Sequence, residues 1–487
     1  MKTILLVPTE NGVGLTSACL GLIYALECQG VKAGFLKPFS QELQPEADRT
    51  TALYRHLFKH ETVEPITYAA LTERLKNDEN DELLEDAVRL HREISKHHDI
   101  IIVEGVLPNG RDPFATELNA NLAKALDAKV IIVSNADINN PVKTASKVDN
   151  QLRFFGGASG ERTAGVLFMR TKGLPEDSAQ IPVTLDPSLR LISDTNQFVS
   201  KIQTTHPMIG KDCMPVIGLV PFSNTLSVPR MSDLAAHISA EWINQGEAAQ
   251  RRVLHSSLIA SNIEHEMHKF VAGELIISGS DRVDVLLASS LASSNGIPLA
   301  GLVLTEQKAP SAQALEFCQA AIKNGLPILH TKLSTFETAQ QLLNLSNEIP
   351  VDDTERAEQV TRFVASHINQ EWLSHLISDS YKPRLSPSAF RHELVQKSIA
   401  AKKRIVLPEG DEPRTVQAAA ICQSRGIAHC VLLAKPEAVV DVAKARGIEL
   451  PHDLEIIDPD LVRENYVEKM VEMRKGKLTE DQAREQI

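Results

Sequence analysis

The stretch Arg404–Ala434, RIVLPEGDEPRTVQAAAICQSRGIAHCVLLA, decides the fold class of the C-terminal part of the chain. It begins with a short, mostly apolar run that is typical of a strand. Pro413 stands where a helix begins, and Gly426 ends the helical pattern. A second apolar run, 428–433, follows as the next strand. The pattern predicts a parallel α/β unit, in which the loop before Pro413 is the usual place for an anionic ligand.

Only a few dozen residues follow this unit before Ile487. A parallel α/β domain needs more chain than that to close its core. We therefore expect residues 386–487 to be the incomplete start of a larger domain. Acids just before a helix usually cap it and complement its dipole. We accordingly expect a structural role, more than a direct catalytic one, for Glu409, Asp411, Glu412 and the neighbouring Arg414.

Composition excludes several classes of protein. A chain of 487 residues is too long for a single core, and roughly three domains are expected. The net charge of −12 argues against nucleic acid as a partner. The six cysteines contain no CxxC pair, which favours reduced thiols in a cytoplasmic protein. We find no signal peptide and no membrane-spanning run, so no membrane partner is expected.

Residues 1–225 alternate strand and helix patterns in the manner of a parallel sheet. A helix is predicted over Leu15–Gln29, with Gly30 as its stop. Residues Pro175–Met208 are polar and rich in Pro, Asp and Ser, so a loop is predicted there. The predicted strands are Ile4–Pro8, Ala33–Lys37, Ile100–Val103, Val130–Ser134, Gly165–Met169 and Val216–Pro221.

The turn Pro8–Thr16, PTENGVGLT, follows a strand and opens a helix, as a phosphate-binding loop does. Gly12 and Gly14 let backbone N–H groups approach phosphate oxygens, and Thr16 can offer a hydroxyl to Mg²⁺. A working loop of this kind carries Lys directly before the hydroxyl residue, where this chain has Leu15. Losing that charge-assisted contact costs about 1.5–3 kcal/mol of binding. It also removes charge neutralisation in phosphoryl transfer, so weak nucleotide binding and little hydrolysis are expected.

A second α/β unit is expected over residues 226–350, followed by a helical linker over residues 351–385. Asp281 is predicted to cap a helix, and Asp352–Leu376 is predicted to be one charged amphipathic helix that leads to the third unit. The Glu264–His268 cluster has its histidines three apart, unlike HExxH spacing, so no metal site is expected. The remaining predicted elements are strand Glu274–Ser278, helix Val283–Asn295, strand Leu299–Leu304, helix Gln313–Asn324 and strand Ile328–His330.

The C-terminal part closely resembles the start of the catalytic domain of phosphate acetyltransferases, and nearly the whole chain resembles the long form of that family. The turn at Pro8–Thr16, with Lys37 and Glu104 after later strands, is similar to the dethiobiotin-synthetase-like branch of the P-loop proteins. The turn that contains Ser280-Asp281-Arg282 resembles a DRTGG-type domain with a degenerate signature. The C-terminal residues that carry the resemblance are Arg384–Pro387, Phe390-Arg391, Leu407–Thr415, Ile457–Pro459 and the helix Tyr466–Arg474.

The resemblance implies a transferase of acetate metabolism that exchanges acetyl between coenzyme A and phosphate, with no required cofactor. It implies no catalytic residue within this chain, because the matching family motifs would lie beyond Ile487. The chain would then be mainly a regulatory region and inactive alone. Gly12, Gly14, Thr16, Lys37 and Glu104 would form a vestigial nucleotide site, open to a small-molecule effector, in a cytoplasmic homo-oligomer.

The chain departs from the P-loop pattern at Leu15 and at Met169-Arg170, and two alternatives to this interpretation are kept. Lys37 is a candidate to replace part of the missing charge, and Met169-Arg170 ends a strand where relatives of the P-loop branch carry an Asn for the base. A relic fold kept for packing and regulation is therefore favoured over a working nucleotide site. The alternatives are an ATP-dependent ligase of the dethiobiotin-synthetase type and a metabolite-sensing module without catalysis.

Overall fold

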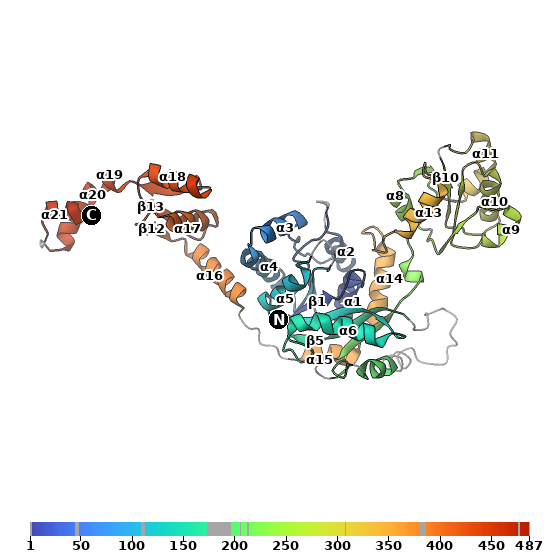
Figure 1. Ribbon diagram of the computed structural model, residues 1–487, viewed down its shortest axis with the longest axis horizontal. Helices are drawn as coiled ribbons and strands as arrows, with labels where there is room; N and C mark the ends of the chain where they lie inside the picture. The colour runs from blue at the N-terminus through green and yellow to red at the C-terminus, as the bar shows by residue number, and fades with distance from the viewer. Residues whose placement is uncertain are drawn as a thin grey trace. The chain divides into compact units, whose positions relative to one another are not determined.

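A computed structural model, drawn in Figure 1, describes residues 2–43, 48–108, 113–172, 196–204, 206–211, 214–306, 308–379, 386–475 and 478–486. Its contacts divide the chain into two compact units. The first comprises Met1–Glu79 and Leu90–Pro383, and the second comprises Asn80–Arg89 and Arg384–Ile487. Most of the predicted loop Pro175–Met208 lies outside the described residues, although residues 196–203 are helical.

The first unit contains a six-stranded sheet in which every neighbouring pair is parallel, in the order β2-β3-β1-β4-β5-β6. All six predicted strands are confirmed, with small changes at their ends. They read as near-continuous apolar runs because both faces of a parallel sheet are covered. The bounds are β1 Lys2–Pro8, β2 Ala33–Leu36, β3 Ile100–Glu104, β4 Lys129–Asp137, β5 Thr163–Lys172 and β6 Val216–Pro221.

Helices cover this sheet, and one of them comes from a distant part of the sequence. Helix α14, Thr354–Ser366, packs on α1, Leu15–Cys28, and both contribute to the same buried cluster. Gly21 marks their closest approach, because a Cβ there would lie 2.4 Å from Val364 Cγ1. The other helices between the strands in the sequence are α2 Arg49–Phe58, α3 Tyr68–Lys76, α4 Asn80–Ser95, α5 Ala115–Ala125 and α6 Pro141–Leu152. Residues 80–89 of α4 belong to the second unit.

The prediction of one helix over Asp352–Leu376 is wrong. The chain forms α14 and then α15, Gln370–Ser378, with a break at residues 367–369. Asn369 caps α15 by accepting a hydrogen bond from Trp372 N, and its own backbone N–H donates to Ile217 O at 2.7 Å. The break therefore ties this segment to the edge of the first sheet.

The rest of the first unit is a five-stranded sheet of order β7-β11-β10-β9-β8, in which only β7 runs antiparallel to its neighbour. Apolar clusters lie on both faces of this sheet. The bounds are β7 Glu241–Asn244, β8 His255–Leu258, β9 Glu274–Gly279, β10 Gly301–Thr305 and β11 Ile328–His330, with helices α8 Met231–His237, α9 Ile263–Glu266, α10 Val283–Ser294, α11 Ala312–Phe317, α12 Gln319–Lys323 and α13 Thr335–Leu343.

Two predictions in this part need correction. Arg282 is the N-cap residue of α10 in place of Asp281, because Arg282 rather than Asp281 directly precedes the first helical residue, Val283, and α10 carries no side-chain cap. The helix predicted over Gln313–Asn324 is interrupted at Cys318, which ends α11 and precedes α12. Both differences concern helix ends, where sequence patterns carry the least information.

The second unit contains a three-stranded parallel sheet of order β12-β13-β14. Glu412 accepts hydrogen bonds from Arg414 N at 2.7 Å and Thr415 N at 3.0 Å at the start of α17. Its structural role as a helix cap is therefore confirmed. The bounds are β12 Arg404–Leu407, β13 His429–Leu433 and β14 Glu455–Ile457, with helices α16 Pro387–Ala401, α17 Pro413–Ser424, α18 Pro436–Arg446, α19 Pro459–Val462, α20 Glu464–Met473 and α21 Glu480–Gln486.

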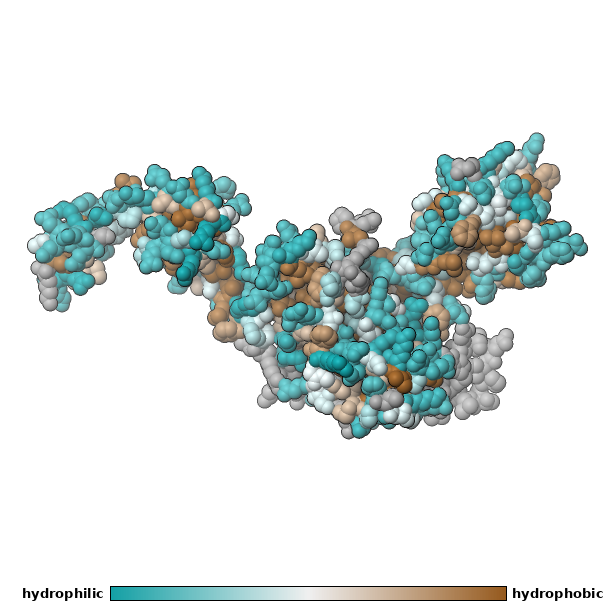
Figure 2. Space-filling model, viewed as in Figure 1, coloured by the Kyte–Doolittle hydropathy of each residue, from teal (hydrophilic) through white to brown (hydrophobic). Residues whose placement is uncertain are grey.

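Hydrophilic residues cover most of the face seen in Figure 2, and apolar residues show between them, in places in groups. Apolar atoms contribute a large part of the accessible surface of ordinary folded proteins. Across the described residues, no helix combines the length and the apolar character that crossing a lipid bilayer requires.

Candidate functional site

The turn between β1 and α1 has the backbone of a phosphate loop. Gly12 and Gly14 have φ angles of 75° and 82°, in the left-handed region that glycine adopts without steric cost. Gly14 is the N-cap residue of α1, and no side chain caps this end of the helix. Leu15, in the position of the missing lysine, is 3% exposed and belongs to the main apolar cluster. The turn keeps its shape, while the residue that would carry the charge packs into the core.

Lys37 lies just after β2 and is held by two buried carboxylates. Its Nζ lies 2.7 Å from Asp48 Oδ2 and 3.3 Å from Glu104 Oε1. Burial alone would lower the pKa of Lys37, but Glu104 and Asp48 outweigh burial and raise it. Lys37 is therefore committed to an internal ion pair, and replacing the missing loop lysine would require breaking this contact.

The two carboxylates differ in their pKa values. Burial would raise the pKa of Asp48, but the ion pair with Lys37 and hydrogen bonds from Thr51 N and Ser40 hold it below its usual range. For Glu104, burial and the negative charge of Asp48 together outweigh Lys37, so its pKa is raised. Glu104 Oε2 is buried and has no hydrogen-bond partner among the described residues. The site thus holds two acids and one ammonium, with Glu104 the easier of the two acids to protonate.

A hydroxyl chain joins the turn to this ion pair. Thr16 Oγ1 lies 3.0 Å from Thr50 Oγ1, and Thr50 donates to Glu104 Oε1 at 3.2 Å. The structure therefore brings Thr16, Lys37 and Glu104 into one network, with Gly12 and Gly14 in the turn beside it. Sequence reasoning missed Thr50 and Asp48, although an Asp at the start of a polar helix is a recognised cap signal.

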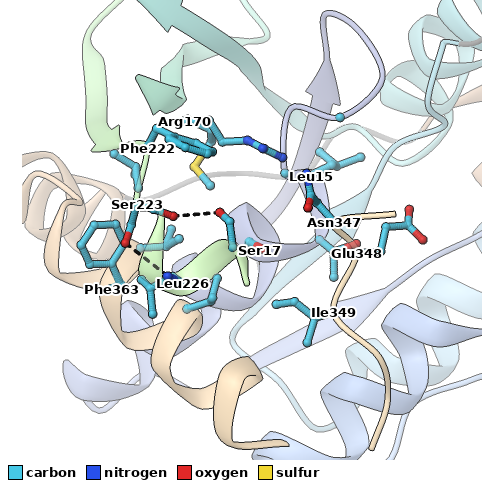
Figure 3. A pocket seen from close by; sticks show the side chains of 18 of the residues that line it. Leu15, Ser17, Arg170, Phe222, Ser223, Leu226, Asn347, Glu348, Ile349 and Phe363 are labelled. Carbon is cyan, nitrogen blue, oxygen red and sulfur yellow. Dashed lines mark hydrogen bonds between the residues drawn. The ribbon is translucent and has the colours of Figure 1, made fainter. Parts of the chain in front are cut away.

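A cavity of about 420 Å³ opens beside the turn (Figure 3). One wall comes from α1 and the ends of β5 and β6, and another comes from α14. Further walls come from residues 222–227 and 346–349, which connect the two sheets of the first unit. Arg49 of α2 and Leu107 also line the cavity. Side chains shown around the cavity include Leu15, Ser17, Arg170, Phe222, Ser223, Leu226, Asn347, Glu348, Ile349 and Phe363.

Three arginines line this cavity, and their partners differ. Arg49 pairs with Glu348 at 3.3 Å, and Arg356 donates to Leu226 O at 2.9 Å and to Asn347 O at 3.0 Å. Arg170 has its guanidinium carbon 5.2 Å from the centre of the Phe222 ring. Sequence reasoning singled out the position of Arg170 but missed the walls made by 222–227 and 346–349, because these residues meet only in the folded chain.

Three segments of the chain match known protein families. Residues 2–230 match the family described as AAA domain, residues 233–345 match the DRTGG domain, and residues 389–487 match Phosphate acetyl/butaryl transferase. The chain is 69% identical, over all 487 residues, to phosphate acetyltransferase from Acinetobacter baylyi and covers 68% of that protein. It is 43% identical over 481 residues to phosphate acetyltransferase from Pseudomonas aeruginosa, with 98% of this chain and 66% of the relative covered. The chain thus spans about two thirds of the length of these relatives.

Solved structures show only distant similarity in fold. The MinD cell division protein of Aquifex aeolicus aligns with 46% of this chain and 84% of its own, at 15% identity and a TM-score of 0.28. The CBS and DRTGG domains of a Clostridium perfringens pyrophosphatase align with 26% of this chain and 50% of their own, at 18% identity and a TM-score of 0.21. At these levels neither similarity carries a functional argument.

Proposed function

The chain belongs to the phosphate acetyltransferase family, and from this premise we propose that it serves the reaction of acetyl-CoA with inorganic phosphate to give acetyl phosphate and coenzyme A. The observation that carries the proposal is the match of residues 389–487 to the transferase family, together with the relatives that align along the whole chain. Membership of this family implies that the protein is an acyltransferase, and that its small-molecule substrates are acetyl-CoA and phosphate.

The chemistry is an acyl transfer between two anionic substrates. A phosphate oxygen attacks the thioester carbonyl, the carbon–sulfur bond breaks, and coenzyme A leaves as a thiolate that takes up a proton. Such a reaction depends on holding both substrates in contact and on stabilising the oxyanion. We assign no catalytic residue and no metal or cofactor within this chain.

The two sheets of the first unit are proposed to regulate the transferase, over residues 1–225 and 226–350, with 351–385 as the connection to residues 386–487. Leu15 in place of the loop lysine and the engagement of Lys37 by Asp48 and Glu104 support a regulatory role over ATP hydrolysis. Gly12, Gly14, Thr16, Lys37 and Glu104 are proposed as the remnant of a nucleotide site. We further propose a cytoplasmic homo-oligomer that responds to small-molecule effectors.

The expectation that this chain is inactive on its own gains no support from the relatives, which align along its entire length. Release of coenzyme A from acetyl-CoA therefore tests the function directly, on the protein isolated as it is naturally expressed. We expect release that requires phosphate and yields one acetyl phosphate per coenzyme A. Sulfate at the same ionic strength is the control, because it supplies a similar anion that forms no acyl phosphate. Release that is independent of phosphate, or no release, would contradict the proposal.

An ATP-dependent ligase remains the competing function, because the turn at Gly12 and Gly14 keeps the backbone of a phosphate loop. The two functions differ in their response to MgATP. We expect little hydrolysis by the wild-type protein, since no lysine directly precedes Thr16 in the turn. Hydrolysis of MgATP that disappears in the Thr16→Ala variant would favour the ligase instead.

A further inference from the structure

The cavity beside the turn carries an excess of positive charge. Its lining contains three guanidiniums, from Arg49, Arg170 and Arg356, and one carboxylate, from Glu348. The chain as a whole has a net charge of −12. A locally cationic cavity in an acidic protein favours an anionic ligand over a neutral or cationic one.

Only one of these cations has no polar partner among the described residues. Arg49 is neutralised by Glu348, and Arg356 is satisfied by two backbone carbonyls. Within the described part of the chain, Arg170 has only its contact with the Phe222 ring. Burial lowers the pKa of Arg170, and no carboxylate of the described residues opposes this shift. Arg170 also lies close enough to Arg356 to help lower the pKa of that residue. An anion placed between them would relieve both effects.

The backbone at Arg170 is in an uncommon conformation. Its φ angle is 49°, in the left-handed region that few residues with a side chain adopt. The pairing of β5 with β6 is irregular between Phe168 and Thr171, so the strand bulges where Arg170 stands. Figure 3 shows the guanidinium extending from the end of β5 toward Leu15, beside the cavity. Strained backbone of this kind is enriched at ligand sites.

The rest of the lining favours an organic anion. Apolar side chains form much of the wall, among them Phe222, Leu226, Ile349 and Phe363. The volume of about 420 Å³ lies within the range of small-molecule sites. A polyphosphate would need the missing loop lysine, whereas a single acid group needs one guanidinium.

We propose that this cavity binds a small organic anion, whose single carboxylate or phosphate group pairs with Arg170 and whose apolar part lies against Phe222, Leu226 and Phe363. The positive charge that binds the ligand is then the guanidinium of Arg170 at the end of β5. In a nucleotide site of the P-loop kind, the positive charge is the lysine of the phosphate loop. Residues 222–227 and 346–349 line the cavity, and the same two segments connect the first sheet to the second. A bound ligand therefore immobilises both connections together, and this last step rests on the proposed regulatory role.

Calorimetric titration of the full-length protein with three probes tests the proposal. The probes are benzoate, phenyl phosphate and inorganic phosphate, each against sodium chloride at equal ionic strength. We expect benzoate or phenyl phosphate to bind once per chain, and inorganic phosphate to bind at least tenfold more weakly than the better of the two. Whichever aromatic probe binds identifies the acid group as carboxylate or phosphate ester.

The Arg170→Gln variant should bind the better probe roughly 10- to 150-fold more weakly, as expected for one charge-assisted hydrogen bond. Arg153→Gln is the matched control, because it removes the same charge from a side chain that is 73% exposed and outside the cavity. A thermal unfolding curve for each variant shows that it is folded. On binding, hydrogen exchange should slow in both 222–227 and 346–349.

Four results would overturn the proposal: no binding of either aromatic probe, equal binding by Arg170→Gln and the wild type, an equal loss in Arg153→Gln, or inorganic phosphate binding as tightly as the aromatic probes. Exchange that slows in neither connection would refute the coupling step alone. None of these readouts uses coenzyme A release, so the transferase proposal and the ligand proposal fail independently.

Discussion

Replacing Lys37 by Met removes one buried charge while keeping most of the side-chain volume. Lys37, Asp48 and Glu104 have side chains that are 11%, 1% and 4% exposed. The substitution therefore leaves two carboxylates in a dry site with no cation. We expect it to destabilise the first sheet more than any other single change in this network.

The distances set the scale of the effect. At an effective dielectric constant of 20, attraction across 2.7 Å and 3.3 Å amounts to about 6 and 5 kcal/mol, before desolvation is subtracted. Breaking a buried ion pair by removing one partner costs about 3–5 kcal/mol in practice. We take that range as the expected loss for Lys37→Met. Glu104→Gln alone should cost less, about 1–2 kcal/mol, because one oxygen of Glu104 already has no partner among the described residues.

Native-state hydrogen exchange of the amides in β1 and β3 is a suitable assay, because it reports the free energy of opening this sheet without assuming that the whole chain unfolds at once. The Lys37→Met/Glu104→Gln double variant is the decisive control. If the loss in Lys37→Met comes from leaving two acids unpaired, the double variant should be more stable than Lys37→Met.

The dependence on pH follows from the directions of the two carboxyl pKa values. The pKa of Asp48 is lowered, so its contribution is present above the ordinary value of 3.8 and is lost as the pH falls through the folded pKa. The pKa of Glu104 is raised, so its contribution is present below 4.5 and is lost as the pH rises through the folded pKa. Glu104→Gln should remove this second loss. A cost below about 1 kcal/mol for Lys37→Met, or a double variant less stable than it, would refute the reasoning.

Three further predictions concern other parts of the first unit. Burial lowers the pKa of His91 to about 4, so stability should fall by up to about 3 kcal/mol as the pH drops from 6.5 to 4, and a pH series of unfolding curves should show a smaller fall in His91→Gln. In Gly105→Ala the new Cβ would lie 2.6 Å from Leu6 O, which should cost about 1–3 kcal/mol by the same exchange assay, and an unchanged opening energy would contradict this. Arg356→Met removes both hydrogen bonds to the carbonyls of Leu226 and Asn347, so residues 222–227 and 346–349 should be cleaved faster by limited proteolysis, while unchanged cleavage would show that Arg356 does not hold them.

The sequence predicts the sheets of this protein well because parallel strands are buried on both faces. Strands such as Val216–Pro221 and Ile328–His330 have the same bounds in the sequence analysis and in the structure. Their apolar runs are short and local, so no tertiary information is needed to find them. The cap at Glu412 is equally local, since its hydrogen bonds reach only two and three residues ahead.

The failures are long-range. The break between α14 and α15 depends on Asn369 N donating to Ile217 O, a contact that no helical period reveals. Asp48 carries a local cap signal, but its pairing with Lys37 becomes visible only once β2 and α2 are placed. The lining of the cavity at Arg170 comes from segments that lie far apart in the sequence, from the turn before α1 to α14. The function could be inferred mainly from the resemblance to a known family, because no local pattern in the chain specifies acyl transfer.

The packing of α14 against α1 has a consequence for how this chain is made. The core of the first sheet includes five residues that are synthesised only after the whole second sheet: Ile349, Ala357, Val364, Ile368 and Leu373. Until α14 is synthesised, the surface of α1 around Gly21 stays exposed to solvent. The five-stranded sheet, in contrast, can bury its own apolar clusters without α14. An expression fragment that stops after β6 would keep that surface bare and should aggregate, whereas one that also carries 349–378, joined by a short spacer, should remain dispersed.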